Sequence, residues 1–184
     1  MKYVRFPKVA VALVGSLALV SGGSAYAMKH HAEMSSENIV EKAVSTDDFS
    51  TLVAAVTAAD LADTLSSDGP FTVFAPLNSA FAKLPAGTVE TLVKPENKGT
   101  LTSILTYHVV SGRFKAKDVM GLIKKAPDGV ASIPTVQGGV LKASMGSDGS
   151  LMLTDAKGGT SKVVMADVNQ SNGVIHAIDT VVMP

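Results

Sequence analysis

One stretch of the chain decides the predicted fold, and it reads Phe71-Thr72-Val73-Phe74-Ala75-Pro76-Leu77-Asn78-Ser79-Ala80-Phe81. Its first five residues are β-branched, aromatic or small, and they lie between two prolines, which is typical of a strand. Asn78 is expected to cap the short helix that follows and that carries Ala80 and Phe81. The stretch therefore predicts a strand that passes directly into a helix.

Amphipathic helices are predicted on both sides of this stretch. Before it, apolar residues recur at helical spacing after Thr46, a candidate N-cap, at Phe49, Leu52, Val53 and Val56. A short helical turn is expected at residues 61–65. After it, Pro95 fits the first turn of a helix whose apolar stripe is Leu101, Ile104 and Leu105.

The last third of the chain is predicted to be mostly strands. A charged helix at residues 116–125, with Leu122 and Ile123 facing inward, precedes short strands around Ser132, Val140, Leu151 and Val163. The loop at residues 169–173 ends in Asn172-Gly173, a pair that tolerates positive φ, so an antiparallel hairpin is expected there, with a final strand at 174–182. Helices followed by strands favour a segregated α+β fold.

Composition excludes several classes of function. The 184 residues hold 16 Lys+Arg against 16 Asp+Glu, so the basic excess needed to neutralise nucleic-acid phosphates is missing. The chain has no cysteine, which excludes disulfides, a zinc ribbon, a thiol nucleophile and a lipid anchor on sulfur. We therefore expect no nucleic-acid partner.

The first 27 residues have the layout of a secretory signal peptide. Three basic residues precede an apolar run at 9–20, and small residues end at Ala25-Tyr26-Ala27. A permanent transmembrane helix is the alternative, but the run is shorter than the roughly 20 residues that a span requires. We predict cleavage after Ala27, a secreted or periplasmic location, and a mature chain with 13 basic and 16 acidic residues, a net charge of −3.

Residues 28–36 are predicted to be a disordered polar tail, followed by one domain at residues 37–184. If cleavage follows Ala27, a free amine lies two residues before His30, an arrangement that can bind Cu(II) or Ni(II) through the amine, backbone amides and the imidazole. The candidate metal-binding residues are Met28, His30, His31 and Met34. The alternative is a tail whose histidines have no function.

Two histidines in the domain could in principle carry chemistry, His108 and His176. In the last strand His176 and Asp179 alternate onto opposite faces, so they are not expected to form a base and its orienting carboxylate. Buried imidazoles need hydrogen-bond partners, and structural roles are the preferred interpretation. The mature chain has no G-x-S-x-G motif, which leaves a serine hydrolase without its usual local signature.

A basic stretch at residues 113–125 could contact an acidic glycan or a lipid headgroup. It holds Arg113 and four lysines: Lys115, Lys117, Lys124 and Lys125. A solvated helix face is the ordinary explanation for such a run and is preferred here.

Three blocks together resemble the fasciclin-like domain family: residues 71–81, Tyr107-His108, and Ser171-Asn172-Gly173-Val174-Ile175-His176-Ala177-Ile178-Asp179. The resemblance covers roughly residues 37–184. It implies a β-wedge of antiparallel strands flanked by helices, in secreted or surface-anchored proteins that are associated with adhesion and are mostly not enzymes. The motif residues that carry it are Phe71, Phe74, Pro76, Asn78, Phe81, Asn172, Gly173, His176 and Asp179.

The same resemblance implies partner-binding residues at Asp167-Val168 and Tyr107-His108. The sequence departs from the family's pattern at Val168, where isoleucine is usual, at residues 169–171, and at Leu77, where threonine is usual. From the resemblance we expect a non-enzymatic adhesion or interaction module that binds a protein or a surface polysaccharide through exposed loops. Copper or nickel binding by the tail is the alternative function.

Overall fold

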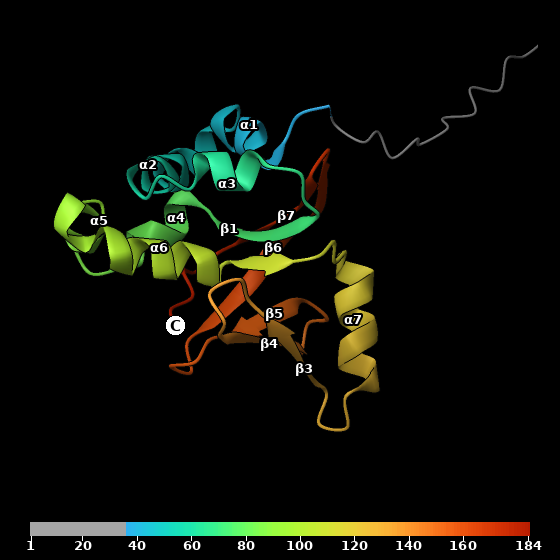
Figure 1. The fold of residues 1–184 in the computed structure, drawn as a ribbon. Helices are drawn as coiled ribbons and strands as arrows, with labels where there is room; N and C mark the ends of the chain where they lie inside the picture. The colour runs from blue at the N-terminus through green and yellow to red at the C-terminus, as the bar shows by residue number, and fades with distance from the viewer. Residues whose placement is uncertain (1–35) are drawn as a thin grey trace, which may run out of the picture. The chain divides into compact units, whose positions relative to one another are not determined.

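The computed structural model describes residues 36–184, which form helices and one mixed sheet (Figure 1). The predicted signal peptide and the four candidate metal-binding residues lie outside the described residues. The helices are α1 (Ile39–Val44), α2 (Ser50–Ala58), α3 (Ala62–Ser66), α4 (Asn78–Ala82), α5 (Thr88–Leu92), α6 (Lys98–Tyr107) and α7 (Ala116–Lys125), with 3-10 turns η1 (Asp47–Phe49) and η2 (Pro95–Asn97). The strands are β1 (Phe71–Pro76), β2 (Val109–Ser111), β3 (Val130–Pro134), β4 (Val140–Met145), β5 (Leu151–Thr154), β6 (Thr160–Gln170) and β7 (Gly173–Ile178).

Seven strands form one sheet in the order β2-β1-β7-β6-β5-β4-β3. Neighbouring strands run antiparallel except for β1 and β7, which are parallel. The expected wedge of antiparallel strands is therefore confirmed except for the β1–β7 pair. Almost a hundred residues connect β1 to β7, and a long connection allows the parallel direction that a hairpin forbids.

The three sequence blocks meet on neighbouring strands at the β2 end of the sheet. β1 lies between β2, which follows Tyr107-His108, and β7, which holds the third block. Phe74 lies opposite His176 in the parallel register, and their rings stack with centroids 5.5 Å apart. The α+β fold and the convergence of the three blocks are both confirmed.

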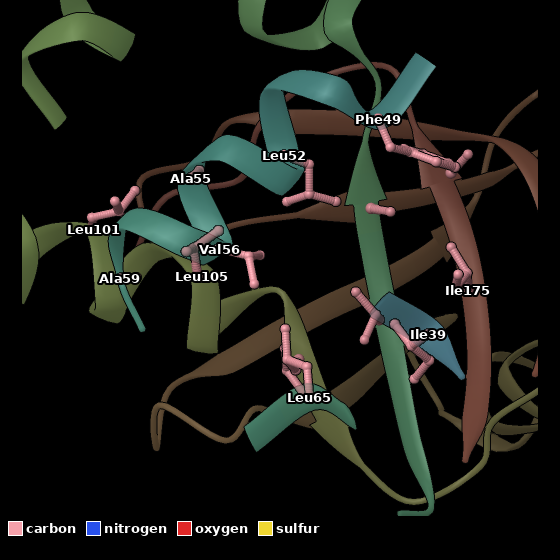
Figure 2. Packing of buried hydrophobic residues seen from close by; sticks show 14 residues of the cluster. Ile39, Phe49, Leu52, Ala55, Val56, Ala59, Leu65, Leu101, Leu105 and Ile175 are labelled. Atoms are coloured by element: carbon pink, nitrogen blue, oxygen red, sulfur yellow. The ribbon is translucent and has the colours of Figure 1, made fainter. Parts of the chain in front are cut away.

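Apolar side chains bury both faces of the central strands. Val73 of β1 and Ile175 of β7 point into a cluster formed with α1, α2, α3 and α6 (Figure 2). Phe74 and Ile178 point the opposite way, into a second cluster with strands β3–β6 and α7. This alternation follows from the two-residue period of a strand, and it explains why β1 and β7 are apolar almost throughout.

Helix α7 packs on β3 and β4 through a narrow stripe. Val119 and Ile123 are buried, whereas Leu122 is 40% exposed. The prediction that Ile123 faces inward is confirmed and the prediction for Leu122 was wrong. An i, i+4 stripe suffices for contact with a single sheet surface, and Leu122 lies about 100° around the helix from Ile123.

Asn78 does not cap its own helix. It is the first residue of α4, and its Oδ1 accepts a hydrogen bond from the backbone N–H of Thr51 at 3.0 Å. Its Nδ2 donates to the carbonyl of Asp47 and to the hydroxyl of Ser50. Asn78 therefore satisfies the start of α2, whose own N-cap position is Phe49 and provides no side-chain acceptor.

The predicted hairpin between β6 and β7 forms, with Ser171 and Asn172 in its turn, but neither Asn172 nor Gly173 has the positive φ on which the prediction relied. Gly173 is required for close packing, because a Cβ there would lie 2.1 Å from the carbonyl oxygen of Phe71. The side chain of Asn172 accepts from the N–H of Ile39 and donates to the carbonyls of Leu65 and Ser67. The hairpin turn is thereby bonded to α1 and to the end of α3.

The last strand ends at Ile178, four residues earlier than predicted. The carboxylate of Asp179 accepts hydrogen bonds from the N–H of Lys162 at 2.8 Å and from the hydroxyl of Thr180. The second carboxylate oxygen of Asp179 forms a salt bridge with Nζ of Lys83 at 3.1 Å. These bonds take the place of strand pairing after Ile178. They give Asp179 a structural role, which fits its presence in the family motif.

Candidate interaction site

Strand β6 is irregular where the predicted Asp167-Val168 pair lies. Its pairing with β7 shifts register between Val163 and Met165 and again between Met165 and Val168. Asp167 has a φ of 61°, which is uncommon for a residue other than glycine. Such bulges re-aim side chains relative to a regular strand. We call residues 164–168 the bulge segment.

Asp167 is held in place by three hydrogen bonds, one of which Nδ2 of Asn169 donates to the Asp167 carbonyl at 3.1 Å. Its Oδ1 accepts a hydrogen bond from the N–H of Ala116 at 2.7 Å, at the first residue of α7. Its own N–H donates to Nδ1 of His176 at 3.3 Å. A carboxylate at a helix N-terminus is stabilised by the unpaired N–H groups and by the helix dipole. Asp167 therefore connects the bulge segment to α7 and to β7.

The bulge segment exposes apolar side chains beside this anchored carboxylate. Val164 is 50% exposed and Met165 56% exposed, and Ala166 is also exposed. Val168 is half-buried and packs against the cluster under the N-terminal helices. The β5–β6 ladder ends at Lys162, so β7 is the strand that pairs with the bulge segment. The bulge segment is therefore an apolar surface that also includes one anchored carboxylate.

His176 is completely buried and is hydrogen-bonded to Asp167 of the bulge segment. Its Nε2 donates to the carbonyl of Phe114 at 2.8 Å, and its Nδ1 accepts from Asp167, which assigns the proton to Nε2. Burial lowers the pKa of His176, outweighing the bond to Phe114 and the nearby charge of Asp167, both of which raise it. His176 is therefore neutral at physiological pH and holds the loop that precedes α7.

Tyr107 and His108 are buried and do not belong to this surface. The Tyr107 hydroxyl donates to the carbonyl of Val140 at 2.8 Å and accepts from the N–H of Ala156 at 3.2 Å, and burial raises the pKa of the phenol. His108 donates from Nδ1 to the carbonyl of Ile104 at 2.8 Å and accepts at Nε2 from the N–H of Val182. Burial lowers the pKa of His108 to about 4.

Direct contact between this pair and a partner does not fit the structure. Tyr107 is 0% exposed and His108 2% exposed, so a partner cannot reach either side chain in this conformation. Their polar atoms are occupied by backbone groups from the second half of the domain and from α6. The pair fixes the packing of the chain and leaves Asp167-Val168 as the accessible half of the predicted site.

The two histidines of the domain and its carboxylates were the candidates for catalysis or metal binding within the described residues. Both ring nitrogens of each domain histidine are hydrogen-bonded to main-chain groups, so neither imidazole is available as a base. His176 and Asp179 have different partners, in line with the expected opposite faces. Within residues 36–184, no group of three or more His, Asp or Glu side chains could hold a metal ion. None of the helices in this part of the chain has the length and apolarity of a membrane span.

Sequence reasoning missed Val164 and Met165. Strict alternation along β6 would expose only one of two neighbours, and the bulge that exposes both has no clear signal in the sequence. It also missed Phe114, whose carbonyl anchors His176, because a backbone acceptor carries no residue-type signature. Asp155 was missed as well, a buried carboxylate that accepts from three main-chain N–H groups in the turn before β6 and near the C-terminus.

Comparison with known proteins gives one family and several relatives. The fasciclin domain model matches residues 47–184. Protein sll1483 of Synechocystis is 49% identical over 150 residues, covering 82% of this chain and 75% of its own. Immunogenic protein MPB70 of Mycobacterium bovis is 36% identical over 156 residues, covering 82% and 71%.

A solved structure has the same fold. It is a FAS1 domain pair from the insect cell adhesion molecule Fasciclin I, with a TM-score of 0.71 and 19% sequence identity. The match covers 82% of this chain and 52% of that one, so the present chain spans about half of the two-domain structure.

Proposed function

The chain belongs to the fasciclin domain family, and from this premise we propose that it is a secreted or periplasmic, non-enzymatic interaction module that binds a protein partner. The bulge segment is the proposed contact surface. The family's adhesion role supports this, since the structural neighbour is described as a cell adhesion molecule. The occupied ring nitrogens of both domain histidines favour recognition over catalysis.

The observation that carries the proposal is the exposure of Val164 and Met165 beside an immobilised carboxylate. Adjacent exposed apolar side chains on a rigid strand gain free energy when a partner removes them from water. Asp167 keeps a second carboxylate oxygen for which the structure describes no hydrogen bond within residues 36–184. A protein partner offers both apolar groups and N–H donors, and it fits this surface better than a glycan does.

The test compares adhesion of purified mature protein and variants to cells or matrix from the native source. Val164→Thr and Met165→Gln keep size and reduce apolar character, and each is expected to weaken binding about 10-fold, the usual effect of altering an interface anchor. Val140→Thr is the control, because Val140 is 46% exposed on another strand. Equal adhesion by all three variants and the unmodified protein would refute the assignment of the surface.

Asp167 needs two substitutions, because it also supports α7. Asp167→Asn keeps an oxygen acceptor for Ala116 and tolerates positive φ, whereas Asp167→Ala loses the acceptor. If the carboxylate contacts the partner, Asp167→Asn weakens adhesion while the stability of the domain changes little. Unchanged adhesion in Asp167→Asn would remove Asp167 from the contact surface.

A further inference from the structure

A polar cleft lies at the hairpin end of the central strands, and it shares no residue with the bulge segment. Its volume is about 540 Å³, within the range of small-molecule sites. The start of α1, the loop after α3, the loop after β2 and the β6–β7 turn all contribute to its lining. The side chains relevant to ligand chemistry are Asn38, Glu41, Ser66, Asp68, Arg113 and Ser171.

Arg113 is fixed at this cleft without a carboxylate partner among residues 36–184. Its Nη2 donates to the carbonyl of Gln170 at 2.8 Å and to that of Ser171 at 3.3 Å. Because Nη2 belongs to both paired edges of a guanidinium, these two bonds compete with a bidentate carboxylate at either edge. The remaining N–H groups can donate singly, which suits a hydroxyl oxygen.

Acceptors lie in the same cleft. No hydrogen bond or ion pair within the described residues engages Asp68, and Glu41 uses one oxygen to accept from the N–H of Asn38. Two carboxylates against one guanidinium leave the lining with a net negative charge, which disfavours an anionic ligand. Groups that both donate and accept, as sugar hydroxyls do, suit a lining that holds both Arg113 and Asp68.

The walls of the cleft are held rigidly. Asn172 bonds the hairpin turn to α1 and α3 through three hydrogen bonds. A Cβ on Gly69 would lie 2.0 Å from the carbonyl oxygen of Asn172, so the loop after α3 packs directly against the turn. Binding to a preformed cleft avoids the entropy cost of ordering it. We propose that this cleft is a binding site for a neutral saccharide, additional to the protein-binding surface.

The test is an NMR titration of the mature protein with glucose, galactose, mannose and their disaccharides, with galacturonic acid as the anionic comparison. We expect at least one neutral sugar to shift amide signals around the cleft, with an affinity in the millimolar range, and galacturonic acid to bind more weakly. Asp68→Asn is expected to weaken binding about 10-fold, since it removes a charge-assisted acceptor. Arg113→Lys should weaken it similarly by removing the fixed N–H donors.

Asp63→Asn is the matched control, because Asp63 is exposed on α3 and does not line the cleft. Asp68 is exposed and makes no described bonds, so its substitution should leave the fold intact even if Arg113→Lys does not. The absence of shifts with every neutral sugar, tighter binding of galacturonic acid, or equal effects of Asp68→Asn and Asp63→Asn would overturn the proposal. Val164→Thr should leave sugar binding unchanged, so the two proposed sites can fail separately.

Discussion

Acid should destabilise the domain through His108, whose imidazole can be accommodated only in its neutral form. Nε2 accepts from the N–H of Val182, and a protonated ring would place two N–H groups against each other. The folded-state pKa is about 4, against an ordinary value of 6.5. Because the unfolded chain binds the proton first as pH falls, this contribution to stability is complete above pH 6.5 and is lost between about pH 6.5 and about pH 4.

The size of the effect follows from that difference in pKa. The full difference corresponds to roughly 3 kcal/mol of unfolding free energy, of which about 2.5 kcal/mol is lost between about pH 7.5 and about pH 4.5. Urea unfolding across this range measures the loss directly. The pKa values of Asp179 and His176 are also lowered, so these residues make stability depend on pH as well. Comparison with a His108 variant isolates the contribution of His108.

His108→Gln is the informative variant, because glutamine has no charge at any pH and can still accept a hydrogen bond. It is expected to be less stable than the unmodified protein at neutral pH, and its free energy of unfolding should fall less steeply with acid. An NMR titration of the His108 ring should in parallel give a pKa well below 6.5. Parallel stability curves for the two proteins over this pH range would refute the assignment of the acid sensitivity to His108.

Further predictions concern close packing, capping and the tail. Gly173→Ala should cost more than about 3 kcal/mol in urea unfolding, because its Cβ has no space, whereas Gly121→Ala, with nothing within 4 Å, should be neutral or stabilising. Asn78→Ala should cost about 1–2 kcal/mol and increase amide exchange at the start of α2, which it caps. Asp167→Ala should cost about 2 kcal/mol and Asp167→Asn less, by the same assay. Cu(II) titration of protein beginning at residue 28 should give a visible d–d band that His30→Ala abolishes, and no band would exclude the tail site.

The central strands could be predicted from the sequence because their pattern is local. β1 is a short apolar run between prolines, and Asn172-Gly173 marks the hairpin between β6 and β7. The helices α1 and α5 were not predicted, since each is about one turn long and lacks a full apolar period. The parallel pairing of β1 with β7 depends on contacts between residues about a hundred positions apart, which no periodicity encodes.

Helix capping also depends on contacts between residues that are distant in the sequence. Asn78 has the residue type of an N-cap and does cap a helix, but that helix starts 28 residues earlier. Thr46 precedes η1 as expected, yet its hydroxyl does not cap η1 and instead donates back to the carbonyl of Lys42 in the last turn of α1. Residue type predicts that a side chain will satisfy a helix end, whereas only the packing decides which end it reaches.

The candidate sites are less predictable than the core because side chains from distant strands position them, as in the loop at residues 112–115. Three side chains from the strands hold this loop and the residue after it. The hydroxyl of Thr72 donates to the carbonyl of Gly112 and accepts from the N–H of Phe114. His176 donates to the carbonyl of Phe114, and Asp167 accepts from the N–H of Ala116.

From this fixed loop Arg113 reaches the polar cleft, while Asp167 belongs to the bulge segment. The family motif blocks thus help to position both surfaces, and Ser171 and Asn172 of the third block also line the polar cleft. Exposed residues such as Val164 and Asp68 can differ among relatives without cost to the core, and a family motif therefore identifies the scaffold and leaves the partner undetermined. Variants at these two positions, measured against their controls, separate recognition from folding.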